Sequence, residues 1–259
     1  MGLFNRKRKQ QKAFEPICWR TPQASYYDVS DIPLTAEHTL IAGATGCGKS
    51  TFLHSVMQAA LAQYSPSEAR FILIDPKAVE LMRYEHLPHT LRYADTEEKC
   101  LSALDFAQVI MARRYAKMKE LDVEMWTTKF GPIVYVIIEE MSDLMVCPSK
   151  AKIKVAIQRL TQKGRAAGIH CICCSQSPAR KILPAEITLN FTAKIALACD
   201  TAIESRQVIG INGAENLPDH GECILKYKRK VEHYEIPFVQ KAEVMELVRY
   251  WQSSACRVA

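Results

Sequence analysis

Long apolar segments are missing from this 259-residue sequence. No run approaches the roughly 18 apolar residues that a membrane-spanning helix needs, and the N-terminus lacks the pattern of a secretory signal peptide. The ten cysteines, found without such a signal, favour a reducing compartment. We therefore expect a cytoplasmic protein.

A cysteine cluster with metal-binding spacing is also missing. Cys171 and Cys174 have the C-x-x-C spacing, but no second pair stands at the distance that a zinc site requires. Their neighbours include β-branched residues, which are typical of strands. This pattern favours a buried strand over a metal site.

Charge of one sign is concentrated at the N-terminus. The formal net charge is +6, and residues 1–30 hold six basic and two acidic side chains, so the other 229 residues carry only +2. Such a tail is most often solvated, and contact with nucleic acid, anionic lipid or a partner is the alternative. The tail or a partner would then place a cytoplasmic protein at the periphery of the membrane.

Glycine is scarce, yet three of the ten glycines fall within six residues. The segment GATGCGKS matches the phosphate-loop pattern G-x-x-x-x-G-K-[ST], whose glycines let backbone N–H groups turn toward a phosphate chain. Lys49 would reach the β- and γ-phosphates and Ser50 would hold Mg²⁺, so ATP and Mg²⁺ are the predicted ligands. The candidate nucleotide-binding residues are Gly43, Ala44, Thr45, Gly46, Cys47, Gly48, Lys49, Ser50 and Thr51.

Apolar strands alternate with helical segments along the chain. We expect strands at 38–43, 70–76, 132–140, 169–176 and 192–199, and helices at about 49–64, 97–121, 151–166, 201–209 and 241–252. A hairpin at 221–239 closes the sheet. Strands that are apolar throughout indicate a mainly parallel sheet with helices on both faces, the α/β architecture of phosphate-loop NTPases.

The strand expected at 132–140 ends in two carboxylates. Glu139 would hold the magnesium shell and Glu140 would polarise the attacking water. Asp is the usual first residue of such a pair, and the longer Glu139 can still accept a magnesium-bound water. Gln176 follows another strand, where its amide could sense the γ-phosphate. Solvated side chains at strand ends are the alternative for all three.

A series of motifs resembles the motor domain of the FtsK/SpoIIIE DNA translocases. It runs in unbroken order over about residues 30–240 and comprises LIAGATGCGKS, FILIDPK, LPHTL, ARRYAKM, VYVIIEEMSDLM, RLTQKGRAAGIH, SQSP, IESRQVIG and GAENLPDHGECIL. The phosphate loop alone would fit many ATPases. The segments IDPK, QKGRAAGIH and GAE are more specific.

The resemblance implies a RecA-like core of the ASCE type that assembles as a ring, usually a hexamer, around double-stranded DNA. ATP would be hydrolysed between subunits, and Arg165 matches the arginine that a neighbour contributes. A guanidinium there could neutralise charge on the γ-phosphoryl group. An arginine that only contacts the last carbonyls of its helix is the alternative.

The chain also departs from the family pattern. Ser177 stands where the family usually has a basic residue, and Ala202 stands where many members have a lysine. We expect a basic extension at 1–30, the motor at 31–240 and a terminal helix and tail at 241–259. A chain of this size resembles the short motors of conjugative plasmids, other mobile elements or phages, whose partners would include a relaxase or a membrane transfer complex.

Two other functions stay open from the sequence. A type VII-like protein-secretion ATPase uses the same fold and similar motifs on peptide cargo. A non-hydrolysing assembly module is suggested by Glu139 and by the missing basic residues. DNA contacts of a translocase should be to the backbone, with little sequence preference.

Overall fold

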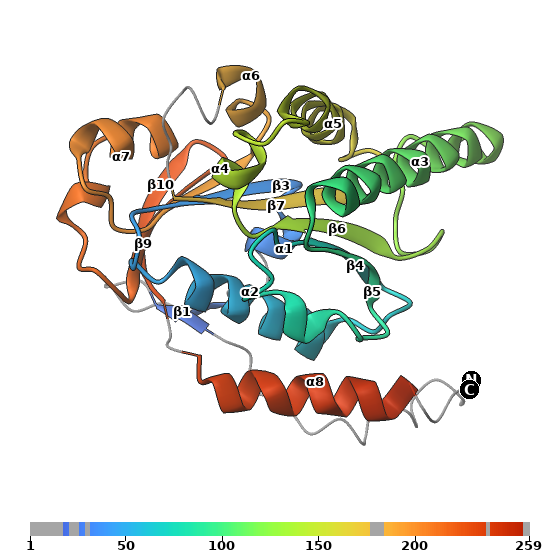
Figure 1. The fold of residues 1–259 in the computed structure, drawn as a ribbon, viewed down its shortest axis with the longest axis horizontal. Helices are drawn as coiled ribbons and strands as arrows, with labels where there is room; N and C mark the ends of the chain where they lie inside the picture. Colours follow the sequence, from blue (N-terminus) through green and yellow to red (C-terminus); the bar gives the residue numbers. More distant parts are fainter. Residues whose placement is uncertain (1–17, 21–25, 29–31, 177–183, 237–238, 256–259) are drawn as a thin grey trace.

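The computed structural model describes residues 18–20, 26–28, 32–176, 184–236 and 239–255. Figure 1 shows a single sheet with helices on both sides. The strands are β1 (Cys18–Arg20), β2 (Tyr26–Asp28), β3 (His38–Ala42), β4 (Ala69–Ile74), β5 (Thr90–Ala94), β6 (Ile133–Ile138), β7 (Ile169–Ser175), β8 (Ala193–Ala196), β9 (Glu222–Tyr227) and β10 (Lys230–Glu235).

The ten-stranded sheet has the order β2-β1-β10-β9-β8-β3-β7-β6-β4-β5. The strands from β8 to β5 in that order run parallel. The remaining strands pair antiparallel, and β9 joins them to β8. The phosphate-loop strand β3 therefore lies in the interior of the sheet between β8 and β7, as expected for a parallel α/β core.

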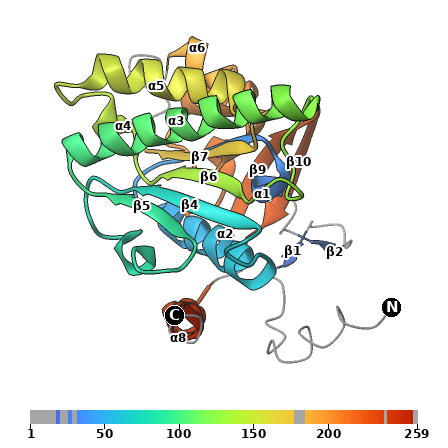
Figure 2. The same ribbon diagram turned by 90° about the vertical axis from the view of Figure 1, so that its right-hand side faces the viewer.

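Helices cover both faces of the sheet (Figure 2). They are α1 (Ile32–Thr35), α2 (Lys49–Gln63), α3 (Glu97–Leu121), α4 (Met141–Leu144), α5 (Lys150–Lys163), α6 (Ala185–Thr188), α7 (Ala202–Ile209) and α8 (Lys241–Ala255), with short 3-10 turns at Met82–Tyr84 and Ala214–Asn216. Helices α3 and α5 lie over one face, whereas α2 lies over the other with α8 outside it. Among the described residues, none of these helices combines the length and apolar character that a membrane crossing needs.

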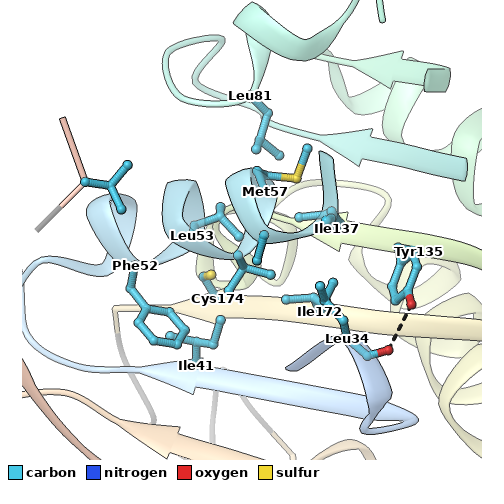
Figure 3. Close-up of a cluster of buried hydrophobic side chains, with 14 of the residues drawn as sticks. Leu34, Ile41, Phe52, Leu53, Met57, Leu81, Tyr135, Ile137, Ile172 and Cys174 are labelled. Carbon is cyan, nitrogen blue, oxygen red and sulfur yellow. Dashed lines mark hydrogen bonds between the residues drawn. The ribbon is translucent and has the colours of Figure 1, made fainter. Parts of the chain in front are cut away.

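The alternation of strand side chains divides the core into two layers. Ile41, Phe52 and Ile172 belong to the layer under α2 (Figure 3), whereas Leu40 and Cys171 belong to the layer under α3 and α5. Burial of this apolar surface is the main driving force for folding. Because both faces are covered, the central strands are apolar throughout, which explains the pattern in the sequence.

The expected elements are present with shifted ends. The helix expected at 151–166 ends at Lys163, with Gly164 as its C-cap, and the chain reverses at Gly168, whose φ angle is 63°. A Cβ atom at Gly164 would lie 2.6 Å from the Ile169 carbonyl oxygen, so only glycine fits there. The strand expected at 192–199 is shortened to β8, and three residues after it Cys199 donates its backbone N–H to the Ala214 carbonyl oxygen instead of to a strand.

Segments at both ends of the described chain pack onto the rest of the fold. In β1, Arg20 pairs with Glu235 of β10, which extends the sheet. In α8, the Trp251 Nε1 atom donates a hydrogen bond to the Leu61 carbonyl oxygen at 2.8 Å. The terminal helix therefore supports α2, the helix that follows the phosphate loop.

Candidate nucleotide-binding site

The parallel strands bring several polar residues to one edge of the sheet. We call the edge at which β3, β4, β6 and β7 end the carboxyl edge, and the edge at which they begin the amino edge. The phosphate loop follows β3, Glu139 follows β6 and Gln176 follows β7. The carboxyl edge of a parallel sheet is where α/β proteins bind ligands.

The phosphate loop has the backbone conformation that its glycines predict. Gly46 and Gly48 have φ angles of 84° and 90°, which L side chains rarely adopt. Gly43 is enclosed, because a Cβ atom there would lie 2.7 Å from the Cys47 Sγ atom. The loop therefore depends on glycine for conformation at two positions and for space at the third.

Lys49 opens α2 and turns back into the phosphate loop. Its Nζ atom donates hydrogen bonds to the carbonyl oxygens of Gly43 and Ala44, both at 2.8 Å. The ammonium group thus lies inside the curve of the loop, where it can exchange these carbonyls for phosphate oxygens. The first backbone N–H groups of α2 add the positive end of the helix dipole at the same point.

A cavity of about 590 Å³ opens beside the loop, within the size range of small-molecule sites. Residues 45–51 of the phosphate loop line it, and so do Glu139 and Gln176. The Thr45 hydroxyl donates to the Gln176 side-chain oxygen at 3.1 Å. The structure therefore brings the predicted loop residues together with Glu139 and Gln176.

Four further residues that line the cavity were not predicted from the sequence. They are Leu197 after β8, His220 and Gly221 before β9, and Ile236 after β10. A methyl group at Gly48 would lie 3.7 Å from the His220 Nδ1 atom, so this ring lies close to the phosphate loop. The segment LPDHGECIL pointed to this turn, but only the closing hairpin brings it to the cavity.

Glu139 lines the cavity, and its surroundings disfavour the ionised form of its carboxyl group. Burial, and then the nearby charges of Asp75 and Glu140, raise the pKa of Glu139 to about 7. Its Oε2 atom is buried and has no hydrogen-bond partner among the described residues. A bound cation would supply the missing interaction, so these residues fit a magnesium shell formed with Ser50.

Glu140 has a different environment from the one expected. Its side chain is only 1% exposed, and it does not line the cavity. Its carboxylate accepts hydrogen bonds from the backbone N–H of Ser142 at 3.0 Å and of Gln176 at 3.2 Å. Glu140 therefore connects the ends of β6 and β7, and it must rotate toward the cavity to activate a water molecule.

A further residue, Asp75, organises the loop after β4. Its Oδ2 atom accepts backbone N–H groups from Val79, Glu80 and Leu81 at 2.8–3.1 Å. The neighbouring Lys77 forms an ion pair with Asp143 at 3.5 Å. In the sequence, IDPK stands out only as a family motif. The position of Asp75 directly after a strand is the signal that could have indicated its role in holding this loop.

Arg165 lies away from the cavity of its own chain. It precedes β7, so it is at the amino edge, where its Nε atom contacts the Glu37 Oε1 atom at 3.1 Å. The Arg165 side chain is 60% exposed. The structure thus separates Arg165 from the other predicted site residues.

The C-x-x-C segment lies inside the sheet, as expected. Cys171 and Cys174 belong to β7 and are both buried, but they lie in opposite core layers. Their thiols therefore face different sides of the sheet and do not converge on one ion.

The sequence matches a known family over most of its length. The FtsK/SpoIIIE family profile covers residues 18–129 and 124–180. The DNA translocase FtsK of Rickettsia typhi is 31% identical over 277 aligned residues, which cover 89% of this chain and 37% of that protein. The DNA translocase FtsK of Clostridium tetani is 33% identical over 244 residues, covering 88% and 32%. The chain spans about a third of the length of these relatives.

Solved structures share the fold at low sequence identity. The cytoplasmic domain of the Thermomonospora curvata type VII secretion ATPase EccC has a TM-score of 0.75 at 20% identity, covering 91% of this chain and 30% of that one. The pCW3 conjugation coupling protein TcpA has a TM-score of 0.75 at 18% identity, covering 90% and 69%. These likenesses confirm the α/β fold of a P-loop ATPase.

Proposed function

Because this chain belongs to the FtsK/SpoIIIE family of P-loop ATPases, we propose that it is an ATP-driven motor that moves double-stranded DNA. One observation carries the nucleotide part of the proposal. A single cavity at the carboxyl edge brings together the phosphate loop, Glu139 and Gln176, although they come from separate parts of the sequence. The DNA part rests on the relatives, which are DNA translocases and of which this chain matches about a third.

The chain's own residues have distinct tasks in this proposal. Lys49 releases its two loop carbonyls and binds the β- and γ-phosphates of ATP. Ser50 and Glu139 hold Mg²⁺, which supplies charge neutralisation for phosphoryl transfer when it is bound. Gln176 lies at the γ-phosphate end of the cavity. Glu140 leaves its backbone partners and orients the attacking water.

We further propose a ring of subunits, a hexamer by family resemblance, with ATP between neighbours. Arg165 would act on the nucleotide of the next subunit. Two features support this: the side chain is largely exposed, and it lies at the edge opposite its own phosphate loop. DNA would pass through the ring and be contacted at its backbone.

The biological setting we propose is DNA transfer by a plasmid, conjugative element or phage. The structural likeness to a conjugation coupling protein agrees with this setting but carries information on fold alone. A relaxase or a membrane transfer complex would be the partner. The protein would be cytoplasmic, and the partner or the basic N-terminal segment would bring it to the membrane surface.

ATP hydrolysis with and without duplex DNA tests the proposal. Wild type should hydrolyse ATP with Mg²⁺, and duplex DNA of any sequence should stimulate it. Lys49→Ala should abolish turnover because the phosphate-neutralising charge is lost. Glu140→Gln should stop hydrolysis but retain ATP binding, measured with a fluorescent ATP analogue, because only water activation is lost.

The alternatives give different results in the same assay. Stimulation by a secretion-signal peptide but not by DNA would indicate a type VII-like secretion ATPase. ATP binding without turnover under all conditions would indicate an assembly module. Wild-type hydrolysis by Glu140→Gln would contradict the assignment of the catalytic carboxylate.

A further inference from the structure

The turn between β9 and β10 has an unusual backbone. Tyr227 pairs with Lys230, so Lys228 and Arg229 form a two-residue hairpin loop. Their φ angles are 46° and 68°. Two successive left-handed residues define the type I′ turn, which normally contains Asn-Gly or Gly-Gly because side chains with a Cβ atom disfavour this region.

A lysine and an arginine therefore occupy positions at which other residues would give a more stable hairpin. Strain of this kind is a reason to look for a function at the site that carries it.

The charges at the tip lack acidic partners. We call Lys228, Arg229 and Lys230 the basic turn, and all three are exposed. No ion pair joins any of them to an acidic group in the described part of the chain. The nearest acidic residue along β10, Glu232, accepts a hydrogen bond from the Tyr234 hydroxyl instead. The basic turn is therefore free to bind an external anion.

Neighbouring contacts hold the base of the hairpin in place. The Lys226 Nζ atom donates to the Ile209 carbonyl oxygen at 2.8 Å, which anchors β9 to α7. The Lys228 Nζ atom lies 4.9 Å from the centre of the Tyr227 ring. The strand that leads to the tip is therefore fixed to the body of the protein.

The basic turn is remote from the nucleotide cavity. Tyr227 pairs with Ala193, the first residue of β8, so the turn lies at the amino edge of the sheet. The phosphate loop lies at the carboxyl edge. ATP bound in the cavity of the same chain therefore cannot be the anion that this turn contacts.

We propose that the basic turn is a contact site for the phosphate backbone of double-stranded DNA. The proposal rests on the proposed motor function, which supplies this polyanion as cargo. Ammonium and guanidinium groups on a two-residue loop suit phosphate oxygens and give little reading of base edges, as a motor that passes over any sequence requires.

A double substitution tests the site without weakening the fold. Lys228→Asn with Arg229→Gly installs the favoured type I′ pair and removes two charges, so thermal stability should stay equal or rise. Duplex affinity at about 0.15 M salt should fall roughly tenfold. Each lost phosphate contact lowers the slope of log K against log salt by about 0.9, so the slope should fall by up to about 1.8.

The matched control removes the same charge elsewhere. Lys117→Gln with Lys119→Gln changes two exposed residues near the end of α3, and it should leave affinity and slope close to wild type. Arg229→Gly alone relieves strain at one residue and should reduce the slope by about half as much as the double change. All variants are tested as the full chain, with melting curves recorded beside the binding curves.

Each outcome separates this inference from the proposed function. Wild type that binds DNA, together with a double variant that binds equally well and with the same slope, overturns the inference and leaves the motor function intact. It would assign the charges to protection of the part of β10 that β1 does not cover, since β1 pairs with β10 only at Glu235. If the double variant loses binding to phosphatidylserine vesicles while its DNA binding stays unchanged, the inference is overturned in favour of a lipid contact. Wild type that binds no duplex DNA would overturn both.

Discussion

The two edges of the sheet differ in how their charged groups are satisfied. At the carboxyl edge, Lys49, Asp75 and Glu140 all bond to backbone groups of their own chain. At the amino edge, Arg165 has one partner in Glu37, and the basic turn has no ion-pair partner among the described residues. The carboxyl edge therefore contains a site that one chain can build, whereas the amino edge presents charges suited to other molecules.

The same contrast explains why the proposed catalytic set is divided. A parallel sheet places the residues after its strands together and the residues before its strands at the other end. Glu37 and Arg165 precede the neighbouring strands β3 and β7, so they meet each other and cannot meet the phosphate loop. If Arg165 contributes to hydrolysis, it must do so for the nucleotide of a second chain.

The largest effect is expected for Arg165→Ala, which tests this division directly. Loss of an arginine that stabilises transferred phosphoryl groups can cost roughly 10³-fold in turnover, while nucleotide binding persists. Arg165→Ala subunits mixed with Glu140→Gln subunits, each inactive alone, should recover part of the activity. Recovery occurs because some interfaces then pair an intact Glu140 with an intact Arg165.

Glu37 provides the matched variants for that experiment. Glu37→Gln keeps an oxygen that can accept the Arg165 Nε–H group, so it should lose less turnover than Glu37→Ala. Mixed rings that are shown to form by crosslinking yet remain inactive would place the action of Arg165 within its own subunit, or limit it to structure.

Most of the carboxyl edge could be predicted from the sequence because it consists of short local motifs. The spacing of Gly43, Gly48 and Lys49 fixes the loop, and the apolar strand before Glu139 fixes the place of the carboxylates. The orientation of Glu140 could not be predicted. It depends on a hydrogen bond from the backbone of Gln176, a residue 36 positions away.

The amino edge and the cavity residues near β9, such as His220, were harder to predict. The partner of Arg165 is Glu37, which no local pattern connects to it. His220 reaches the cavity only because β9 returns beside β8. The left-handed conformation of Lys228 and Arg229 was hidden because the sequence KYKRKV lacks the glycine that usually marks such a turn. These features arise from long-range pairing, which residue spacing does not encode.

A smaller effect is expected for Glu139, whose charge is unfavourable in the folded chain. With nucleotide absent and metal removed by EDTA, its pKa of about 7 lies above the value near 4.5 of an unfolded chain. The folded state then holds the proton more tightly, so Glu139 lowers stability as pH rises from about 4.5 to about 7.

Glu139→Gln removes this penalty and should therefore raise the melting temperature at pH 8. The expected gain is about 2–4 °C, the equivalent of roughly 1 kcal/mol for a chain of this size. At pH 4.5 the two proteins should melt alike in scanning calorimetry, since wild-type Glu139 is then protonated. Glu139→Asp keeps the charge at the strand end and should show no such gain. If Glu139→Gln raises the melting temperature equally at both pH values, the gain does not come from removing the ionised carboxylate of Glu139.

The smallest effect is expected for His220, which lines the cavity near Gly48. Contact between an aromatic ring and a nucleotide base contributes roughly 1 kcal/mol or more, so His220→Ala should weaken ATP binding about fivefold. Tripolyphosphate has no base, so its binding should not change, whereas Lys49→Ala should weaken both ligands. His86→Ala, an exposed histidine away from the cavity, is the matched control. Displacement of a fluorescent ATP analogue measures both ligands on the same protein. Equal weakening of ATP and tripolyphosphate by His220→Ala would place this ring at the phosphates and join it to the charged part of the carboxyl edge.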